Sequence, residues 1–204
     1  MSKQFHSRRK FLRTLSGFTG LSLAPNAFSQ INTMPLESGH EQPLASAKKI
    51  PLVSHQEKQL DFLHLHTGES LSTTFFSGNE FVATEMSEVN YLLRDHHNGE
   101  VFTMNPELLN LLYDVRSALG TQKPFHVISA YRSPATNEKL RKNSNKVAKK
   151  SLHMQGKAID IRIPGVDVKD IHKAALAVKG GGVGLYTRSD FVHLDVGRVR
   201  RWGK

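Results

Sequence analysis

Two short histidine–aspartate motifs restrict how this chain can fold. The first lies in Ser-Leu-His-Met-Gln-Gly-Lys-Ala-Ile-Asp, where six residues separate His153 from Asp160. The second is Phe-Val-His-Leu-Asp, where a single leucine separates His193 from Asp195. Two imidazoles and a carboxylate are the ligand set of a catalytic zinc ion, which keeps its fourth position open for water. The two motifs together therefore predict a zinc hydrolase.

The local geometry expected of both motifs supports this interpretation. Gly156 allows the chain to turn before the strand that follows, which can bring the imidazole of His153 back beside Asp160. Side chains alternate along a strand, so His193 and Asp195 point into the same space while their apolar neighbours face the core. The alternative explanation for this spacing is a sheet face in contact with solvent.

The N-terminal segment predicts export. Residues 7–12, Ser-Arg-Arg-Lys-Phe-Leu, form a twin-arginine motif, and a mildly apolar stretch follows over residues 15–24. Small residues at Ala27 and Ser29 occupy the positions that a signal peptidase reads. We expect residues 1–29 to be a signal peptide that takes the protein to the periplasm by the twin-arginine translocation machinery. A basic disordered tail is the alternative interpretation.

Charge and cysteine content narrow the choice of partners. The net charge is +10, and residues 1–29 contribute five cations and no acid, which leaves +5 on the mature protein. Many of the remaining cations lie in residues 139–150 and 198–204. Basic patches suit an anionic partner, here the wall polymer or phospholipid head groups, although a solvated basic face is also possible. Export argues against nucleic acid, and the absence of cysteine excludes a disulfide.

The remaining chain divides into a linker and one domain. Residues 30–57 contain three prolines, three serines and a glycine and show little periodicity, which is typical of a flexible linker. Residues 58–204, about 145 residues, suit a single domain with one core. The signal's apolar stretch is too short and too polar to span a bilayer, so the mature protein is expected to have no transmembrane segment.

Periodicity and turn signals predict an α+β fold. Strands are expected at 60–66, 70–76, 125–129, 158–163, 183–186 and 191–196, and helices at 82–95, 106–119, 134–142 and 167–178. Asn105 and Pro106 are a typical helix start, as N-cap and first helical residue. Helices come early and most strands late, which favours α+β over an alternating α/β arrangement.

The motifs also resemble a known family. They are Ser-Ala-Tyr-Arg-Ser at 129–133, Asn137, Ser151-x-His153-x-x-Gly156-x-Ala158-x-Asp160, and His193. This pattern is similar to that of D-Ala-D-Ala-type zinc metallopeptidases. His66-Thr-Gly-Glu69, Gly181-Gly-Val-Gly184 with Tyr186, and Phe191-Val-His-x-Asp195-x-Gly197 resemble its twin-arginine-exported murein endopeptidase branch.

The resemblance runs from about Leu60 to Trp202. It implies a small single domain with a central antiparallel sheet flanked by helices and a zinc site on that sheet. It implies one zinc ion per chain, held by His153, Asp160 and His193. It also implies a hydrolase that cuts the peptide crosslinks of peptidoglycan.

Further roles follow from the resemblance. Arg132 occupies the position of the family's arginine near the substrate carbonyl, where its fixed charge can stabilise an oxyanion. Substrate-binding residues are expected in the same cleft: Tyr131, Ser133, Ser151 and Tyr186.

The general base is the least decided role. Several relatives place a glutamate three residues before the last ligand, or a histidine two before it, and here those positions hold Asp190 and Phe191. Asp195 is the first candidate because strand alternation places it beside His193, and Asp190 is the alternative. Asp195 can instead be a carboxylate that orients a ligand, as metal sites commonly need.

Two other functions stay open at this stage. The first is a carboxypeptidase that trims stem peptides, which needs a cleft closed at one end. The second is a wall-binding module that contains zinc but does not turn over substrate. An acid beside the open metal position would argue against this second function.

Overall fold

The computed structural model describes residues 56–144 and 147–203, which fall in one compact unit. The predicted signal peptide, residues 1–29, lies outside the described residues, as does the predicted linker, residues 30–57, apart from its last two positions. In the described part of the chain, no helix is both long and apolar enough to cross a membrane.

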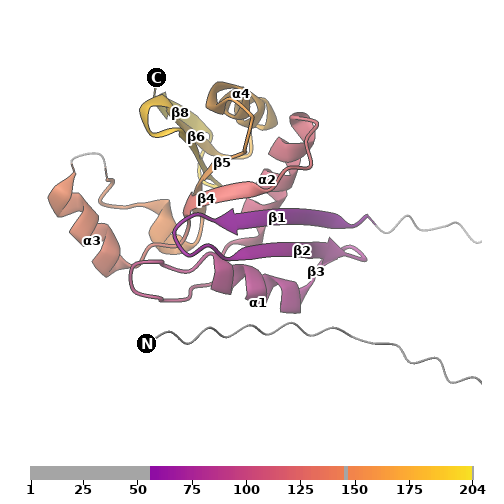
Figure 1. Cartoon of the computed structure of the whole chain (residues 1–204), viewed down its shortest axis with the longest axis horizontal. Coiled ribbons are helices and arrows are strands. Elements are labelled where there is room, and N and C mark those ends of the chain that lie inside the picture. Colours follow the sequence, from indigo (N-terminus) through magenta and orange to yellow (C-terminus); the bar gives the residue numbers. More distant parts are fainter. Residues whose placement is uncertain (1–55, 145–146, 204) are drawn as a thin grey trace, which may run out of the picture. The chain divides into compact units, whose positions relative to one another are not determined.

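Eight strands and four α-helices make up this unit (Figure 1). The strands are β1 (Lys58–His64), β2 (Ser70–Ser77), β3 (Glu80–Phe81), β4 (Phe125–Ser129), β5 (Ala158–Arg162), β6 (Gly182–Tyr186), β7 (Phe191–Asp195) and β8 (Arg200–Gly203). The helices are α1 (Ala83–Leu92), α2 (Pro106–Ala118), α3 (Pro134–Asn143) and α4 (Val168–Val178), with short 3-10 turns η1 (Leu152–Gln155) and η2 (Thr187–Ser189). The α+β prediction is confirmed.

The strands form one sheet in the order β3-β2-β1-β4-β5-β7-β6-β8. Its central pairs, β4 with β5, β5 with β7, and β7 with β6, are antiparallel, as predicted. The sheet as a whole is mixed, however, because β1 pairs with β4 and β6 pairs with β8 in parallel. Both parallel pairs are joined by long connections that return the chain to its starting end, which a parallel pairing requires.

Local sequence explains where the main helix starts. The side chain of Asn105 accepts a hydrogen bond from the backbone N–H of Glu107 at 2.9 Å, and Pro106 occupies the first turn. The buried face of α2 is a leucine stripe with Val115, since these residues recur at helical spacing. The N-cap prediction at Asn105 is therefore confirmed.

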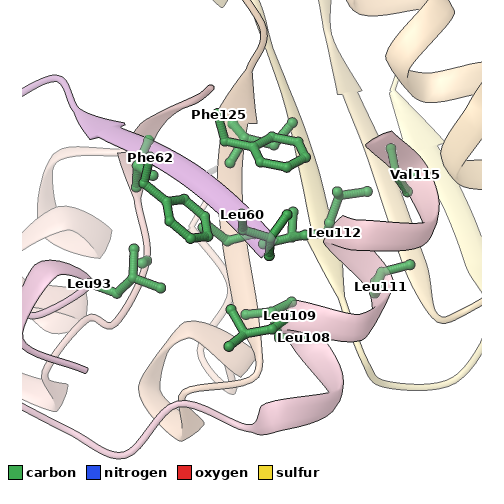
Figure 2. Close-up of a cluster of buried hydrophobic side chains, with 14 of the residues drawn as sticks. Leu60, Phe62, Leu93, Leu108, Leu109, Leu111, Leu112, Val115 and Phe125 are labelled. Carbon is green, nitrogen blue, oxygen red and sulfur yellow. The ribbon is translucent and has the colours of Figure 1, made fainter. Parts of the chain in front are cut away.

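One part of the core lies between this helix and the first half of the sheet, and the same buried cluster continues to α4, β6 and β7. Figure 2 shows Leu60 and Phe62 of β1, Phe125 of β4 and Leu112 of α2 gathered in one cluster, and all four are buried. The rings of Phe62 and Phe125 lie 6.1 Å apart. Elsewhere α1 packs on β2 and α4 on β6, while Figure 1 draws α3 apart from α2 and α4. This packing anchors β4, beside which the site-bearing strand β5 lies.

Candidate metal centre

Three side chains with metal-ligand chemistry converge on the central strands. One donor atom from each of His153, Asp160 and His193 lies within 4.8 Å of the other two. The Oδ1 atom of Asp160 lies 2.8 Å from Nδ1 of His193 and 3.4 Å from Nε2 of His153. The two imidazole nitrogens lie 3.2 Å apart. The structure thus brings together the three residues that the sequence motifs predicted.

Strand pairing explains two of the three positions. Asp160 on β5 is the direct partner of His193 on β7 in the antiparallel register. Residues directly opposite each other project to the same face of a sheet. The two ligand candidates are therefore held side by side by backbone hydrogen bonds.

His153 reaches the same place from the turn η1. The side chain of Ser151 caps this turn by accepting a hydrogen bond from the backbone N–H of His153 at 3.4 Å. Gly156 ends it in the left-handed region, with φ of 63°, and a Cβ there would collide with the backbone carbonyl of Thr103. The expected turn at Gly156 is confirmed.

Each imidazole is oriented by a hydrogen bond on its outer side. Nδ1 of His153 donates to the backbone carbonyl of Ala130 at 2.6 Å. Nε2 of His193 donates to the carboxylate of Asp195 at 3.0 Å. Such bonds set the tautomer, so the remaining nitrogen of each ring faces Asp160.

The donor set fits a tetrahedral ion. Bonds of about 2.0–2.1 Å to a tetrahedral zinc ion place its ligand atoms about 3.3 Å apart. The three observed separations, 2.8, 3.2 and 3.4 Å, are close to that spacing. With three protein ligands, such an ion would keep one coordination position open.

Without a metal, the three groups hold one another by charge. Burial lowers the pKa of His193, but hydrogen bonds to Asp160 and Asp195 outweigh it and raise that pKa to about 9. Burial alone would raise the pKa of Asp160, yet the imidazoles of His153 and His193 keep it well below its usual range. The raised pKa means that His193 carries a proton at neutral pH when no metal is present. A bound metal ion would displace that proton.

Asp195 is completely buried and has both oxygens engaged. Oδ1 accepts hydrogen bonds from the backbone N–H groups of Gly182 and Gly197 at 3.2 and 2.9 Å and from Nη1 of Arg200 at 2.9 Å. Oδ2 accepts from His193 and from Nη2 of Arg200 at 2.7 Å. Burial acts to raise the pKa of Asp195, but His193 and Arg200 hold it below its usual range. Its surroundings are those of a carboxylate that orients His193.

Asp190 directly follows η2 and forms an ion pair at the surface. Its Oδ2 atom pairs with Nη1 of Arg162 at 3.1 Å, and 63% of its side chain is exposed. Both oxygens of Asp195 are therefore occupied, and the Asp190 carboxylate pairs with Arg162 and not with a metal candidate.

A cavity of about 470 Å³ opens beside the metal candidates. Arg132, Ser151 and Tyr186, all predicted to belong to the cleft, line it together with His153, Asp160 and His193.

Tyr131 and Ser133 are not among the described residues that line this cavity. The Tyr131 hydroxyl donates to Glu100 at 2.6 Å, and its ring stacks on Phe102. The hydroxyl of Ser133 caps α3 by accepting from the backbone N–H of Thr136 at 3.2 Å. Tyr131 and Ser133 flank Arg132, and their contacts to Glu100, Phe102 and Thr136 hold in place the segment that carries Arg132.

The side chain of Arg132 is only 12% exposed, and its guanidinium makes only long contacts. It donates to Asn137 Oδ1 at 3.4 Å and to Ser129 Oγ at 3.3 Å, and it lies 3.8 Å from Asp160 Oδ2. Burial lowers the pKa of Arg132, which Asp160 partly offsets. A buried cation with long contacts is available to an anion in the cavity.

Sequence analysis missed two site residues, both on the short strand β8. Arg200 holds Asp195, and the ring of Trp202 lies 5.1 Å from that of His193. The indole N–H of Trp202 donates to the Tyr186 hydroxyl at 2.9 Å. A Cβ at Gly184 would meet the Trp202 ring, which explains the glycine. Nothing in the local sequence identified Trp202 as the partner of this glycine.

Comparisons with known proteins agree with this site. A family profile described as peptidoglycan L,D-endopeptidase MepK matches residues 53–202. The peptidoglycan L,D-endopeptidase MepK of Escherichia coli strain K12 is 45% identical over 139 residues, which cover 68% of this chain and 76% of that protein. The probable peptidoglycan L,D-endopeptidase MepK of Haemophilus influenzae is 34% identical over 198 residues, covering 96% and 95% of the two chains.

The profile covers most of the chain, and its range includes His153, Asp160 and His193. The chain therefore belongs to the peptidase M15 family described as peptidoglycan L,D-endopeptidase MepK.

Proposed function

We propose that this protein is an exported, zinc-dependent peptidoglycan L,D-endopeptidase that hydrolyses peptide crosslinks of the cell wall. The observation that carries the proposal is the convergence of His153, Asp160 and His193 beside a cavity, in a member of this family. The names of the relatives, peptidoglycan L,D-endopeptidases, supply the substrate. Their name also specifies an L,D bond as the bond that is cut, which the sequence motifs did not identify.

The donor set supports zinc as the metal. Two imidazole nitrogens and one carboxylate oxygen at tetrahedral spacing are typical of catalytic zinc with an open position. When bound, zinc supplies a Lewis acid for the scissile carbonyl and an acidified water at neutral pH. His153, Asp160 and His193 would hold it, and the contacts to Ala130 and Asp195 orient the two imidazoles.

The other residues contribute positioning and charge. In this proposal the Arg132 guanidinium stabilises the negative charge that develops on the substrate carbonyl oxygen. Ser151 and Tyr186 line the wall that the peptide contacts. Tyr131 and Ser133 act indirectly by holding the Arg132 turn, and Asp195 orients His193 with the help of Arg200.

Digestion of purified crosslinked murein by the mature protein tests the function. We expect dimeric stems to be converted to monomers whose masses identify cleavage at an L,D bond. Chelator should stop the reaction and zinc should restore it, while His153→Ala should remove both metal and turnover. Release of single terminal residues alone would indicate a carboxypeptidase. Zinc and murein binding without any cleavage would indicate a wall-binding module.

For export we propose the twin-arginine route, supported by Arg8 and Arg9 in residues 1–29. Lysine does not reproduce the guanidinium fork of arginine, so the double change Arg8→Lys with Arg9→Lys should leave the precursor in the cytoplasm. Cell fractionation followed by immunoblotting measures this. Normal periplasmic levels of the double variant would mean that another secretion route operates.

A further inference from the structure

The lining of the cavity beside the metal candidates contains more basic than acidic side chains. The lining includes three cations, Arg132, Lys150 and Arg200, while Asp160 is the one carboxylate among the described residues that line it. Arg200 is neutralised by two hydrogen bonds to Asp195. If Asp160 serves the metal, Arg132 and Lys150 keep uncompensated charge facing the cavity.

Lys150 is the more available of these two cations. Within the part of the chain that the structure describes, it makes no hydrogen bond and no ion pair, and it is exposed to solvent. Arg132, in contrast, is largely buried and already contacts Asn137, Ser129 and Asp160. A free ammonium at the rim of a cavity is suited to an anionic group of a ligand inside it.

The position of Lys150 is tied to the metal site. It directly precedes Ser151, whose hydroxyl caps the turn η1 that carries His153. Ser151 is 7% exposed, so the backbone next to Lys150 is anchored. Lys149 is also exposed but does not line the cavity. The two neighbouring lysines therefore carry the same charge in different positions relative to the site.

The proposed substrate has an anionic group in a suitable place. An L,D bond joins the carboxyl of an L-centre to the nitrogen on a D-centre. When the D-centre is an α-amino acid, the carbon attached to the scissile nitrogen also carries a carboxyl group. That group is an anion when free and is neutral when amidated.

We propose that Lys150 recognises this free carboxylate and makes the enzyme select ionised stem peptides over their carboxamide forms. The inference rests on the proposed function, because it names the part of the proposed substrate that this cavity recognises. Charge pairs at partly exposed positions contribute modestly, so the selection is expected to be roughly 3- to 10-fold.

The test compares two stem-peptide dimers that differ only in this group, one with a free carboxylate and one with a carboxamide on the D-centre. The wild-type protein should show a lower KM for the carboxylate dimer, with similar kcat for both. Lys150→Gln should abolish the preference by raising the KM of the carboxylate dimer alone. Lys150→Glu should reverse the preference, because it places like charges together.

Matched changes at Lys149 provide the control. Lys149→Gln and Lys149→Glu alter the net charge equally, one residue away, and should keep the wild-type preference. An unchanged preference in Lys150→Gln would overturn the proposal. An equal loss of preference in Lys149→Gln would also overturn it, because the preference would then depend on the net charge of the protein and not on the position of Lys150.

Binding separates this inference from the proposed function. Calorimetry with the metal-free protein measures the affinity of both dimers without turnover. If the wild-type protein cuts neither dimer, the proposed activity fails, yet a carboxylate preference in binding that depends on Lys150 would still support the recognition role. Equal affinity of wild-type protein and Lys150→Gln for the carboxylate dimer would refute it.

Discussion

At the residue scale, the two aspartates considered as general bases have very different surroundings. Asp195 is fully buried, with five hydrogen-bond donors around its oxygens, whereas Asp190 is mostly exposed and pairs with Arg162. A base needs a free lone pair within reach of the attacking water. The surroundings of Asp195 favour the orienting role that sequence analysis had left open beside the role of base.

Asp195→Asn distinguishes these two roles. As an orienting residue, its loss should weaken zinc binding by about 10- to 100-fold, and excess zinc should restore much of the rate. As a base, its loss should lower kcat by roughly 10²- to 10⁴-fold whatever the zinc concentration. We expect the first result, measured as rate against added zinc, with circular dichroism to verify folding.

Asp190→Asn serves as the matched carboxylate control and should have little effect on the zinc affinity or on kcat. A large loss of rate in Asp190→Asn that zinc does not reverse would assign the role of base to Asp190. A zinc-insensitive loss in Asp195→Asn alone would return that role to Asp195.

At the element scale, the site is assembled from segments that each supply one part. The antiparallel register of β5 with β7 sets Asp160 beside His193, and a slip of one residue would turn one of them to the other face. The turn η1 supplies His153. The strand β8 runs parallel to β6. It places Arg200 in hydrogen-bonding contact with Asp195 and the ring of Trp202 beside that of His193. The C-terminal strand therefore completes the support of the metal centre.

At the scale of the whole molecule, a group of histidines links the first hairpin to the site-bearing half. The rings of His66 and His96 stack with centroids 4.3 Å apart, and His64 and His97 lie 5.4 and 4.1 Å from His96. The carboxylate of the neighbouring Asp95 accepts from the backbone N–H groups of His97 and of Ser133, beside Arg132. The histidine cluster therefore adjoins, through Asp95, the segment that carries Arg132.

The cluster predicts acid sensitivity. Burial first, and then the neighbouring His97, His66 and His64, lower the pKa of His96 from 6.5 to about 4, against a smaller opposite effect of Asp95. Between these values the unfolded chain binds more protons than the folded one, so the free energy of unfolding decreases as pH falls. The contribution of His96 is on the order of 1 kcal/mol, or about 2–4 °C in Tm.

Thermal unfolding followed at pH 7, 5.5 and 4.5 measures this effect, with the zinc concentration held constant. His96→Gln should reduce the fall in Tm between pH 7 and pH 4.5 by that amount, because glutamine does not titrate. If the variant and the wild-type protein lose Tm equally on acidification, His96 does not contribute to the acid sensitivity.

The features that could be predicted are those with a local physical cause. Hydrophobic periodicity located the buried face of α2, and the capping preference of asparagine located its start at Asn105. Alternation predicted the strand 125–129 with its observed bounds. Motif spacing together with family resemblance selected His153, Asp160 and His193.

The rest depended on contacts between distant segments. The four-residue strand β8 has too little periodicity to be recognised alone, and its pairing with β6 follows from the path of the whole chain. For the same reason the parallel pairs of the sheet were not expected. The burial of Asp195 required both β6 and β8, since Gly182 and Arg200 supply its partners. The sequence by itself determined the α+β class and the main helices, because these arise from neighbouring residues, and its motifs selected the ligand set through their resemblance to a known family. The tertiary structure alone decided what surrounds each ligand, because burial and charge at a site are properties of everything packed around it.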